Sequence, residues 1–74
     1  MTVGSDAALI RVNGEDEPLS VTSLAALLTE KQIGPERRGV AVALNGNVVP
    51  RAHWAETALA HGDIVEIVLP KQGG

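Results

Sequence analysis

The sequence predicts an α+β fold in which one main helix covers one face of a mixed five-stranded sheet. Two Asn-Gly pairs, at residues 13–14 and 45–46, follow short β-prone runs, and this pair favours the type I′ turn of a β-hairpin. Residues 21–33 instead repeat apolar side chains at three- and four-residue steps, which is the period of a helix. A last β-prone run, residues 64–69, completes five strands with one helix, a proportion that indicates an α+β domain.

The first hairpin is predicted around Asn13-Gly14. Leu9–Val12 is β-prone, and a return strand is expected over residues 17–19. Pro18 lies in this return strand and has no backbone N–H, so it cannot bond to neighbours on both sides. We therefore expect this strand at an edge of the sheet.

The single helix is predicted over residues 23–32. Thr22 is the candidate N-cap, Lys31 lies near the negative end of the helix dipole, and Gly34-Pro35 is expected to stop the helix. The periodic apolar side chains share one helical face, formed by Val21, Leu24, Leu27, Leu28 and Ile33.

The second half supplies three more predicted strands, at residues 40–44, 48–49 and 64–69. Side chains alternate between the two faces of a strand. In the first of these strands, one face therefore carries Val40, Val42 and Leu44 and the other carries Ala41 and Ala43. In the last, one face carries Val65, Ile67 and Leu69, which are expected to face the helix, and the other carries Glu66 and Val68.

The connection at residues 51–61 is expected to hold one helical turn around Trp54, which serves as a core anchor. If the last strand pairs in parallel beside the first, the architecture is a ubiquitin-like β-grasp. The Pro18 strand then forms one edge and the short Val48 strand forms the other. We divide the chain into a flexible N-terminus at residues 1–8, a β-grasp domain at residues 9–69 and a flexible tail at residues 70–74.

Composition excludes several classes of function. The net charge is −3 and the six basic residues are scattered, whereas nucleic-acid binding needs clustered Lys and Arg. The apolar run at residues 40–44, which no other run exceeds, is far short of the ~20 residues that span a bilayer. Residues 1–8 lack the basic start and apolar stretch of a signal peptide. We therefore expect a cytoplasmic protein that binds neither nucleic acid nor membrane.

No enzyme-like site is evident in the sequence. It has no cysteine, no phosphate-binding glycine pattern and no clear Ser/His/Asp set. His53 and His61 are the candidate bases, but surface histidines in loops are the favoured interpretation, and no other strong ligands are spaced to form a metal site with them. We expect neither a catalytic residue nor a bound metal.

The C-terminus points to a function. Pro70 ends the last strand and favours an extended Leu69 before it, so the tail is predicted to leave the sheet. The terminal Gly73 and Gly74 carry no side chains, and such a tail can enter a narrow channel and bring its carboxylate against a nucleotide phosphate. A frayed chain end is the ordinary alternative, but the position of the glycines just after the last strand favours a function.

The carboxylate of Gly74 is the predicted reactive group. It needs activation because it is an anion without a leaving group. Attack on the α-phosphate of ATP gives an acyl-adenylate and releases pyrophosphate, and a sulfur nucleophile then displaces AMP to leave a thiocarboxylate. That group is ionised at neutral pH and nucleophilic through sulfur. Both modifications are transient, no bound cofactor is expected, and the chain acts as a co-substrate of partner enzymes.

A set of residues in the second half of the chain forms a family pattern, namely residues 42–51 (VALNGNVVPR), Trp54, Thr57, Leu59, residues 62–68 (GDIVEIV) and Gly73-Gly74. With this pattern the second half of the chain resembles the ThiS family of thiamine-biosynthetic sulfur carriers, and the first half does so loosely. The resemblance implies a β-grasp fold, adenylation by a ThiF-type enzyme, sulfur loading from a donor such as a cysteine desulfurase relay, and sulfur donation to thiazole synthase (ThiG). The family's terminal Gly-Gly maps onto Gly73 and Gly74. The first hairpin and residues 1–8 carry no specific family marker.

Other functions share this architecture. The same tail serves MoaD-like carriers of molybdopterin synthesis, carriers of cysteine synthesis, and protein modifiers that end on a target lysine. An interaction domain with an inert tail is a further alternative. Residues 45–51 together with Trp54 favour the thiamine pathway.

The sheet face away from the helix is predicted to dock partner enzymes. Strand alternation places small and mildly apolar side chains there, which form a flat patch. The residues predicted on this face are Arg11, Ala41, Ala43, Glu66 and Val68.

Overall fold

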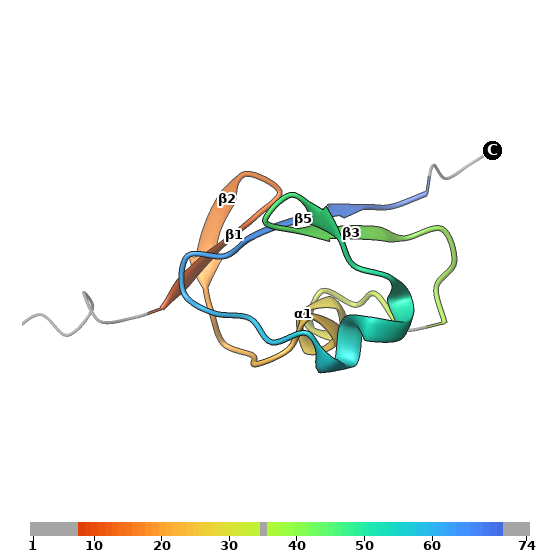
Figure 1. The fold of residues 1–74 in the computed structure, drawn as a ribbon, viewed down its shortest axis with the longest axis horizontal. Helices are drawn as coiled ribbons and strands as arrows, with labels where there is room; N and C mark the ends of the chain where they lie inside the picture. Colours follow the sequence, from red (N-terminus) through yellow and green to blue (C-terminus); the bar gives the residue numbers. More distant parts are fainter. Residues whose placement is uncertain (1–7, 35, 71–74) are drawn as a thin grey trace, which may run out of the picture.

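A computed structural model describes residues 8–34 and 36–70 of the chain. It contains one five-stranded sheet in the order β2-β1-β5-β3-β4, with β1 and β5 parallel and the other neighbours antiparallel. In Figure 1 the sheet forms one layer, and α1 and the short helix η2 lie on the same side of it. The α+β class, the β-grasp topology and both predicted edge strands are confirmed. The elements are β1 (Leu9–Val12), β2 (Glu15–Pro18), α1 (Leu24–Glu30), β3 (Ala41–Leu44), β4 (Asn47–Val48), the 3₁₀ helix η2 (Arg51–Glu56) and β5 (Ile64–Val68).

Both hairpin turns have the predicted backbone. Asn13 and Gly14 have φ values of 50° and 86°, and Asn45 and Gly46 have values of 52° and 87°. Positive φ at both central residues is the requirement of the type I′ turn. Because such a turn has only two residues, pairing resumes at once, and β2 begins at Glu15 rather than at residue 17.

The two turn asparagines also bind β5, which the sequence did not predict. The Asn13 amide accepts a hydrogen bond from the Ile67 N–H at 2.7 Å and donates to the Ile67 carbonyl at 3.2 Å. The Asn45 amide accepts from the Ile64 N–H at 2.9 Å and donates to Asp63 Oδ1 at 3.1 Å. Each hairpin turn therefore helps to hold the central strand β5.

The N-terminus of α1 corrects one prediction. Ser23, not Thr22, is the N-cap, because its backbone is extended (φ −132°, ψ 160°) and its hydroxyl accepts a hydrogen bond from the Ala26 N–H at 3.1 Å. A side-chain oxygen in this position satisfies a backbone donor that the first helical turn leaves free.

The C-terminus of α1 corrects a second prediction, the residue at which the helix ends. Gln32 takes a positive φ of 64°, its N–H donates to Thr29 O at 2.9 Å, and the Ile33 N–H donates to Leu28 O at 2.8 Å. This is a Schellman motif, with Ile33 and Leu28 both buried. The helix therefore ends at Glu30, before the predicted stop at Gly34-Pro35, and Lys31 is its C-cap.

The core lies between the sheet and the two helices. Trp54 is 4% exposed, and its indole N–H donates to the Val49 carbonyl at 2.8 Å, which confirms it as the anchor of the helical turn in the 51–61 connection. Leu69 is 44% exposed, so its predicted inward orientation is wrong; β5 ends one residue before it. The buried apolar residues are Ile10, Val12, Leu24, Leu27, Leu28, Ile33, Val42, Trp54, Leu59, Val65 and Ile67.

Candidate functional site

The five side chains predicted for docking lie together on the sheet face turned away from α1, which we call the open face. The register of β3 and β5 sets Ala41 opposite Val68 and Ala43 opposite Glu66. Arg11 lies on β1, the other neighbour of β5. Ala43 is half-buried and the other four are exposed. These residues are brought together because they alternate with core residues along their strands.

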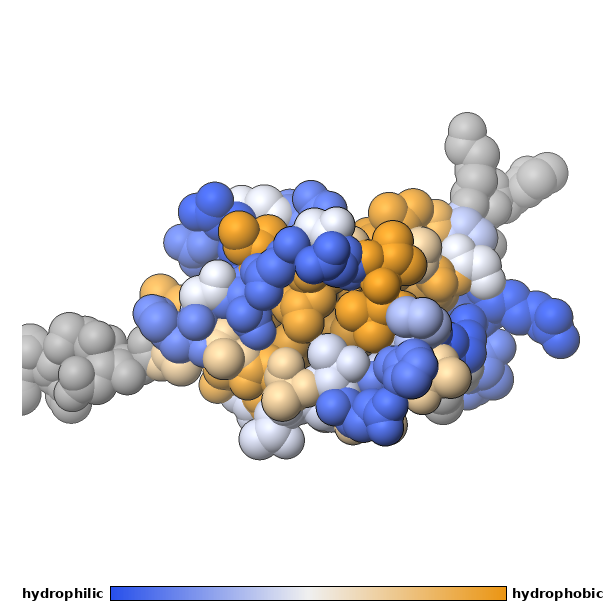
Figure 2. All heavy atoms as spheres, viewed as in Figure 1, coloured by the Kyte–Doolittle hydropathy of each residue, from blue (hydrophilic) through white to orange (hydrophobic). Residues whose placement is uncertain are grey.

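Two further apolar side chains extend the open face. Val48 pairs with Ala43 and is 75% exposed, and Ile64 pairs with Arg11 and is 45% exposed. The position of Val48 on this face was predictable from the sequence, because the two-residue turn at Asn45-Gly46 sets Val48 opposite Ala43. Strand alternation was a sufficient signal for Ile64, because it lies two residues before Glu66 and so shares its face. Figure 2 shows hydrophobic side chains reaching the surface where Figure 1 places β3 and β5.

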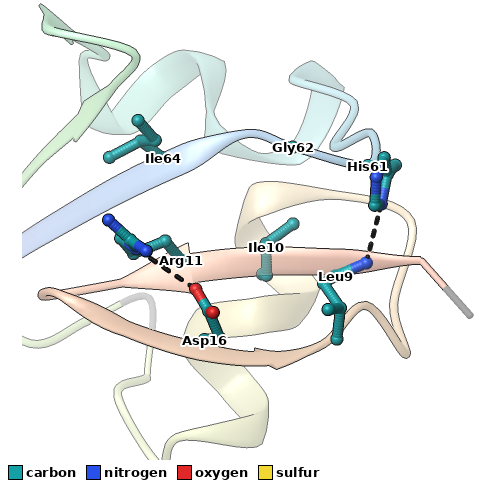
Figure 3. Close-up of a pocket in the computed structure, with 7 residues that line it drawn as sticks. All are labelled: Leu9, Ile10, Arg11, Asp16, His61, Gly62 and Ile64. Atoms are coloured by element: carbon teal, nitrogen blue, oxygen red, sulfur yellow. Dashed lines mark hydrogen bonds and ion pairs between the residues drawn. The ribbon is translucent and has the colours of Figure 1, made fainter.

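A shallow hollow of about 280 Å³ opens at the start of β5. At its rim, Arg11 Nε lies 3.1 Å from Asp16 Oδ1, and both side chains are more than half exposed. His61 Nδ1 accepts a hydrogen bond from the Leu9 N–H at 2.9 Å, so this imidazole connects the loop before β5 to the start of β1 (Figure 3). The hollow is lined by Leu9, Ile10, Arg11, Asp16, His61, Gly62 and Ile64.

The histidines are surface residues, as predicted. His53 lies on η2 with Nδ1 2.6 Å from Glu56 Oε2, both groups being exposed. The nearby Thr57 hydroxyl donates to the His53 carbonyl at 2.6 Å rather than to the imidazole. His53 therefore does not activate the Thr57 hydroxyl as a nucleophile.

The part of the chain that the structure describes holds no cluster of three or more His, Asp or Glu side chains that could bind a metal ion. Among these same residues, no helix has the length and apolar character needed to cross a bilayer. The candidate site within the described residues therefore consists of the mildly apolar open face and the shallow hollow at the start of β5.

The predicted reactive end of the chain lies outside the described residues. Pro70, half-buried, is the last residue described, and Gly73 and Gly74 follow it; most of the predicted N-terminal segment, residues 1–7, is likewise outside. The structure does place the point where the chain leaves the sheet. That point is the end of β5, which lies between β1 and β3 in the middle of the sheet.

Comparison with known proteins gives a consistent set of relatives. A sequence model of the ThiS family matches residues 7–74. The sulfur carrier protein ThiS of Thermus thermophilus is 38% identical over 66 residues, which cover 89% of this chain and all of that protein. A crystal structure of the thiamine biosynthesis protein ThiS from Geobacter metallireducens has a TM-score of 0.72 and 28% identity, covering 89% of this chain and 99% of that one. A solution structure of a thiamine biosynthesis protein from Geobacter metallireducens also gives 0.72 and 28%, covering 89% and 87%.

Proposed function

The chain belongs to the ThiS family, and from this premise we propose that it is a sulfur carrier of thiamine biosynthesis that reacts through the carboxylate of Gly74. The observation that carries the proposal is the central position of β5, the last strand of the chain. A central strand leads directly into the last residues of the sequence, which end in Gly-Gly. The domain behind this strand serves to present the end to partner enzymes.

The proposed chemistry has two steps. A carboxylate oxygen of Gly74 attacks the α-phosphate of ATP, forming a C-terminal acyl-adenylate as pyrophosphate leaves. A sulfur nucleophile then attacks the acyl carbon and AMP departs with the bonding electrons. Where the donor carries this sulfur as a persulfide, the product is an acyl disulfide, and a thiol of a partner protein cleaves its S–S bond by forming a disulfide with the donor, which leaves sulfur in place of one oxygen. The resulting thiocarboxylate donates its sulfur to thiazole formation.

We assign the catalytic groups of both steps to partner proteins. The expected partners are a ThiF-type adenylating enzyme, a sulfur donor such as a cysteine desulfurase relay, and thiazole synthase (ThiG). The two exposed histidines are engaged with Leu9 and Glu56, so neither is assigned a role in the chemistry. The carrier is a co-substrate in this scheme.

The open face is the proposed docking surface for these enzymes. Its centre is apolar and flat, because Ala41 and Ala43 have short side chains. They lie beside the exposed Val48 and Val68. Glu66 adds one negative charge among them. A partner that fits this surface is flat and apolar opposite the methyl groups and places a positive charge opposite Glu66, because only then does the contact leave no buried charge unpaired.

Deletion of Gly74 tests the proposal. The shortened chain ends about 3.3–3.6 Å earlier in an extended conformation, whereas reacting atoms need to approach within about 3–3.5 Å. We expect loss of ATP–pyrophosphate exchange and of the mass gain that accompanies replacement of oxygen by sulfur. The last core residue is Ile67, so the melting temperature should match that of the full chain.

Two outcomes would redirect the interpretation. If the shortened protein were still adenylated and still supported thiazole formation in a reconstituted assay, Gly74 would not be the reactive residue. If the full-length protein were adenylated but ended on lysine side chains of other proteins, the modifier function that shares this fold would replace the carrier function. Intact mass of the protein purified from its own cells separates the thiocarboxylate from an isopeptide product.

A further inference from the structure

The start of the tail lies against a glycine in the loop before β3. Continuing the β3–β5 register two residues beyond Ala41↔Val68 places Gly39 opposite Pro70. An ideal Cβ added to Gly39 would lie 2.9 Å from the Pro70 Cβ and 3.2 Å from its Cγ. Such a separation is shorter than real Cβ contacts, so the proline ring occupies the space that any side chain at residue 39 would need. Gly39 also has a φ of 79°, which disfavours other residues.

The loop that carries Gly39 is tied to the core. The Arg51 guanidinium donates a hydrogen bond to the Arg37 carbonyl, and it lies 4.8 Å from the centroid of the Trp54 ring. Trp54 itself is buried and bonded to the Val49 carbonyl. Figure 1 shows this loop rising beside the end of β5, where the chain leaves the sheet. Pro70 therefore lies against a loop that Arg51 links to the core residue Trp54.

We propose that Gly39 is a positioning residue for the reaction at Gly74. Glycine lets the Pro70 ring lie directly on the loop backbone, and this contact sets the direction in which residues 71–74 leave the domain. This inference rests on the proposed carrier function. A side chain at residue 39 pushes Pro70 away, and the change of direction is passed on to the carboxylate.

The first test compares two glycine variants in ATP–pyrophosphate exchange with the adenylating enzyme. Gly39→Ala should lower kcat about 10- to 100-fold, the loss that a displacement of about 1 Å causes. KM for the carrier should stay unchanged because the open face is intact. Gly14→Ala is the matched control, since Gly14 has a similar φ of 86° but nothing within 4 Å of its added Cβ. It should lower the melting temperature as Gly39→Ala does and leave kcat unchanged.

The second test asks whether the proline ring is the cause. Pro70→Gly removes the ring that an added Cβ would meet, so Gly39→Ala should reduce kcat much less in the Pro70→Gly background than in the natural one. Such non-additivity is the mark of two residues in contact. Equal losses in the two backgrounds would overturn the proposal, because strain at residue 39 would then explain the effect without Pro70.

The third test does not depend on the reaction. The chain has no cysteine, so Gln72→Cys accepts a single spin label, and paramagnetic broadening of backbone amides reports where the tail points. Gly39→Ala should change the set of broadened amides, and Gly14→Ala should not. If the natural chain is never adenylated, the proposed function fails, while the label still decides whether Gly39 sets the direction of the tail. If the natural chain is adenylated and Gly39→Ala behaves as Gly14→Ala in every measurement, the positioning role is wrong.

Discussion

The two faces of the sheet are built from alternate residues of the same strands and differ sharply in what covers them. On β5, Val65 is fully buried and Ile67 is 8% exposed, whereas their neighbours Ile64 and Val68 are 45% and 62% exposed. The covered face packs on α1, η2 and the long connection, and it holds the large aliphatic side chains of the core. The open face carries small or partly polar residues around a few exposed apolar ones.

The difference between the two faces indicates that the covered face provides stability and the open face is available for recognition. A domain of this length gains only about 3–5 kcal/mol from a single core, so nearly all of that stability must come from the covered face. The open face contributes little to the core. Its apolar side chains Val48 and Val68 are nevertheless exposed to solvent. Exposed apolar side chains that cluster on one face are typical of interaction sites, which is consistent with the proposed docking role.

Truncation of one residue on each face of β5 should show the largest contrast. Ile67→Ala removes a buried side chain and should lower the free energy of unfolding by about 2–5 kcal/mol. Val68→Ala, one residue further along, should change it by no more than about 0.5 kcal/mol because the side chain is exposed. Urea or thermal unfolding measures both. An Ile67→Ala protein as stable as the natural one would mean that the strand faces are inverted.

A substitution at the start of α1, the helix on the covered face, should have an intermediate effect on stability. Ser23→Ala removes the N-cap hydrogen bond to Ala26 and should cost about 0.5–2 kcal/mol of stability. Thr22→Ala is the matched control, since Thr22 is exposed and is not the N-cap. Equal losses from the two variants would show that the cap assignment is off by one residue.

The smallest effect on stability is expected on the open face. Ala43→Arg should change the free energy of unfolding by no more than about 0.5 kcal/mol, yet weaken binding to the adenylating enzyme by placing a large charged group at the centre of the docking surface. Ala55→Arg, on the exposed side of η2, introduces the same charge elsewhere and should leave binding unchanged. Unaltered affinity of the Ala43→Arg protein, measured by titration calorimetry, would remove the docking role from this face.

Much of the fold followed from local patterns in the sequence. The Asn-Gly turns, the helical period around Leu24 and Leu27, and the edge position of Pro18 each depend on a few neighbouring residues. Backbone preference and side-chain period act over that distance, so the two hairpins, the helix and the alternation of faces along each strand were predictable. The parallel pairing of β1 with β5, which fixes the strand order, joins distant residues and was predicted only as a condition. The terminal Gly-Gly was also evident from sequence, and its reactivity stays a prediction.

Other features depended on contacts between distant residues. Thr22 and Ser23 are both suitable caps by composition, and only the backbone geometry at Ser23 selects one of them. Leu69 has the period of a core residue, but β5 ends before it. The bonds of Asn13 to Ile67 and the contact of Gly39 with Pro70 join residues far apart in the chain. Tertiary structure decided these features because they require two segments to meet, and local preference carries no information about which segments will do so.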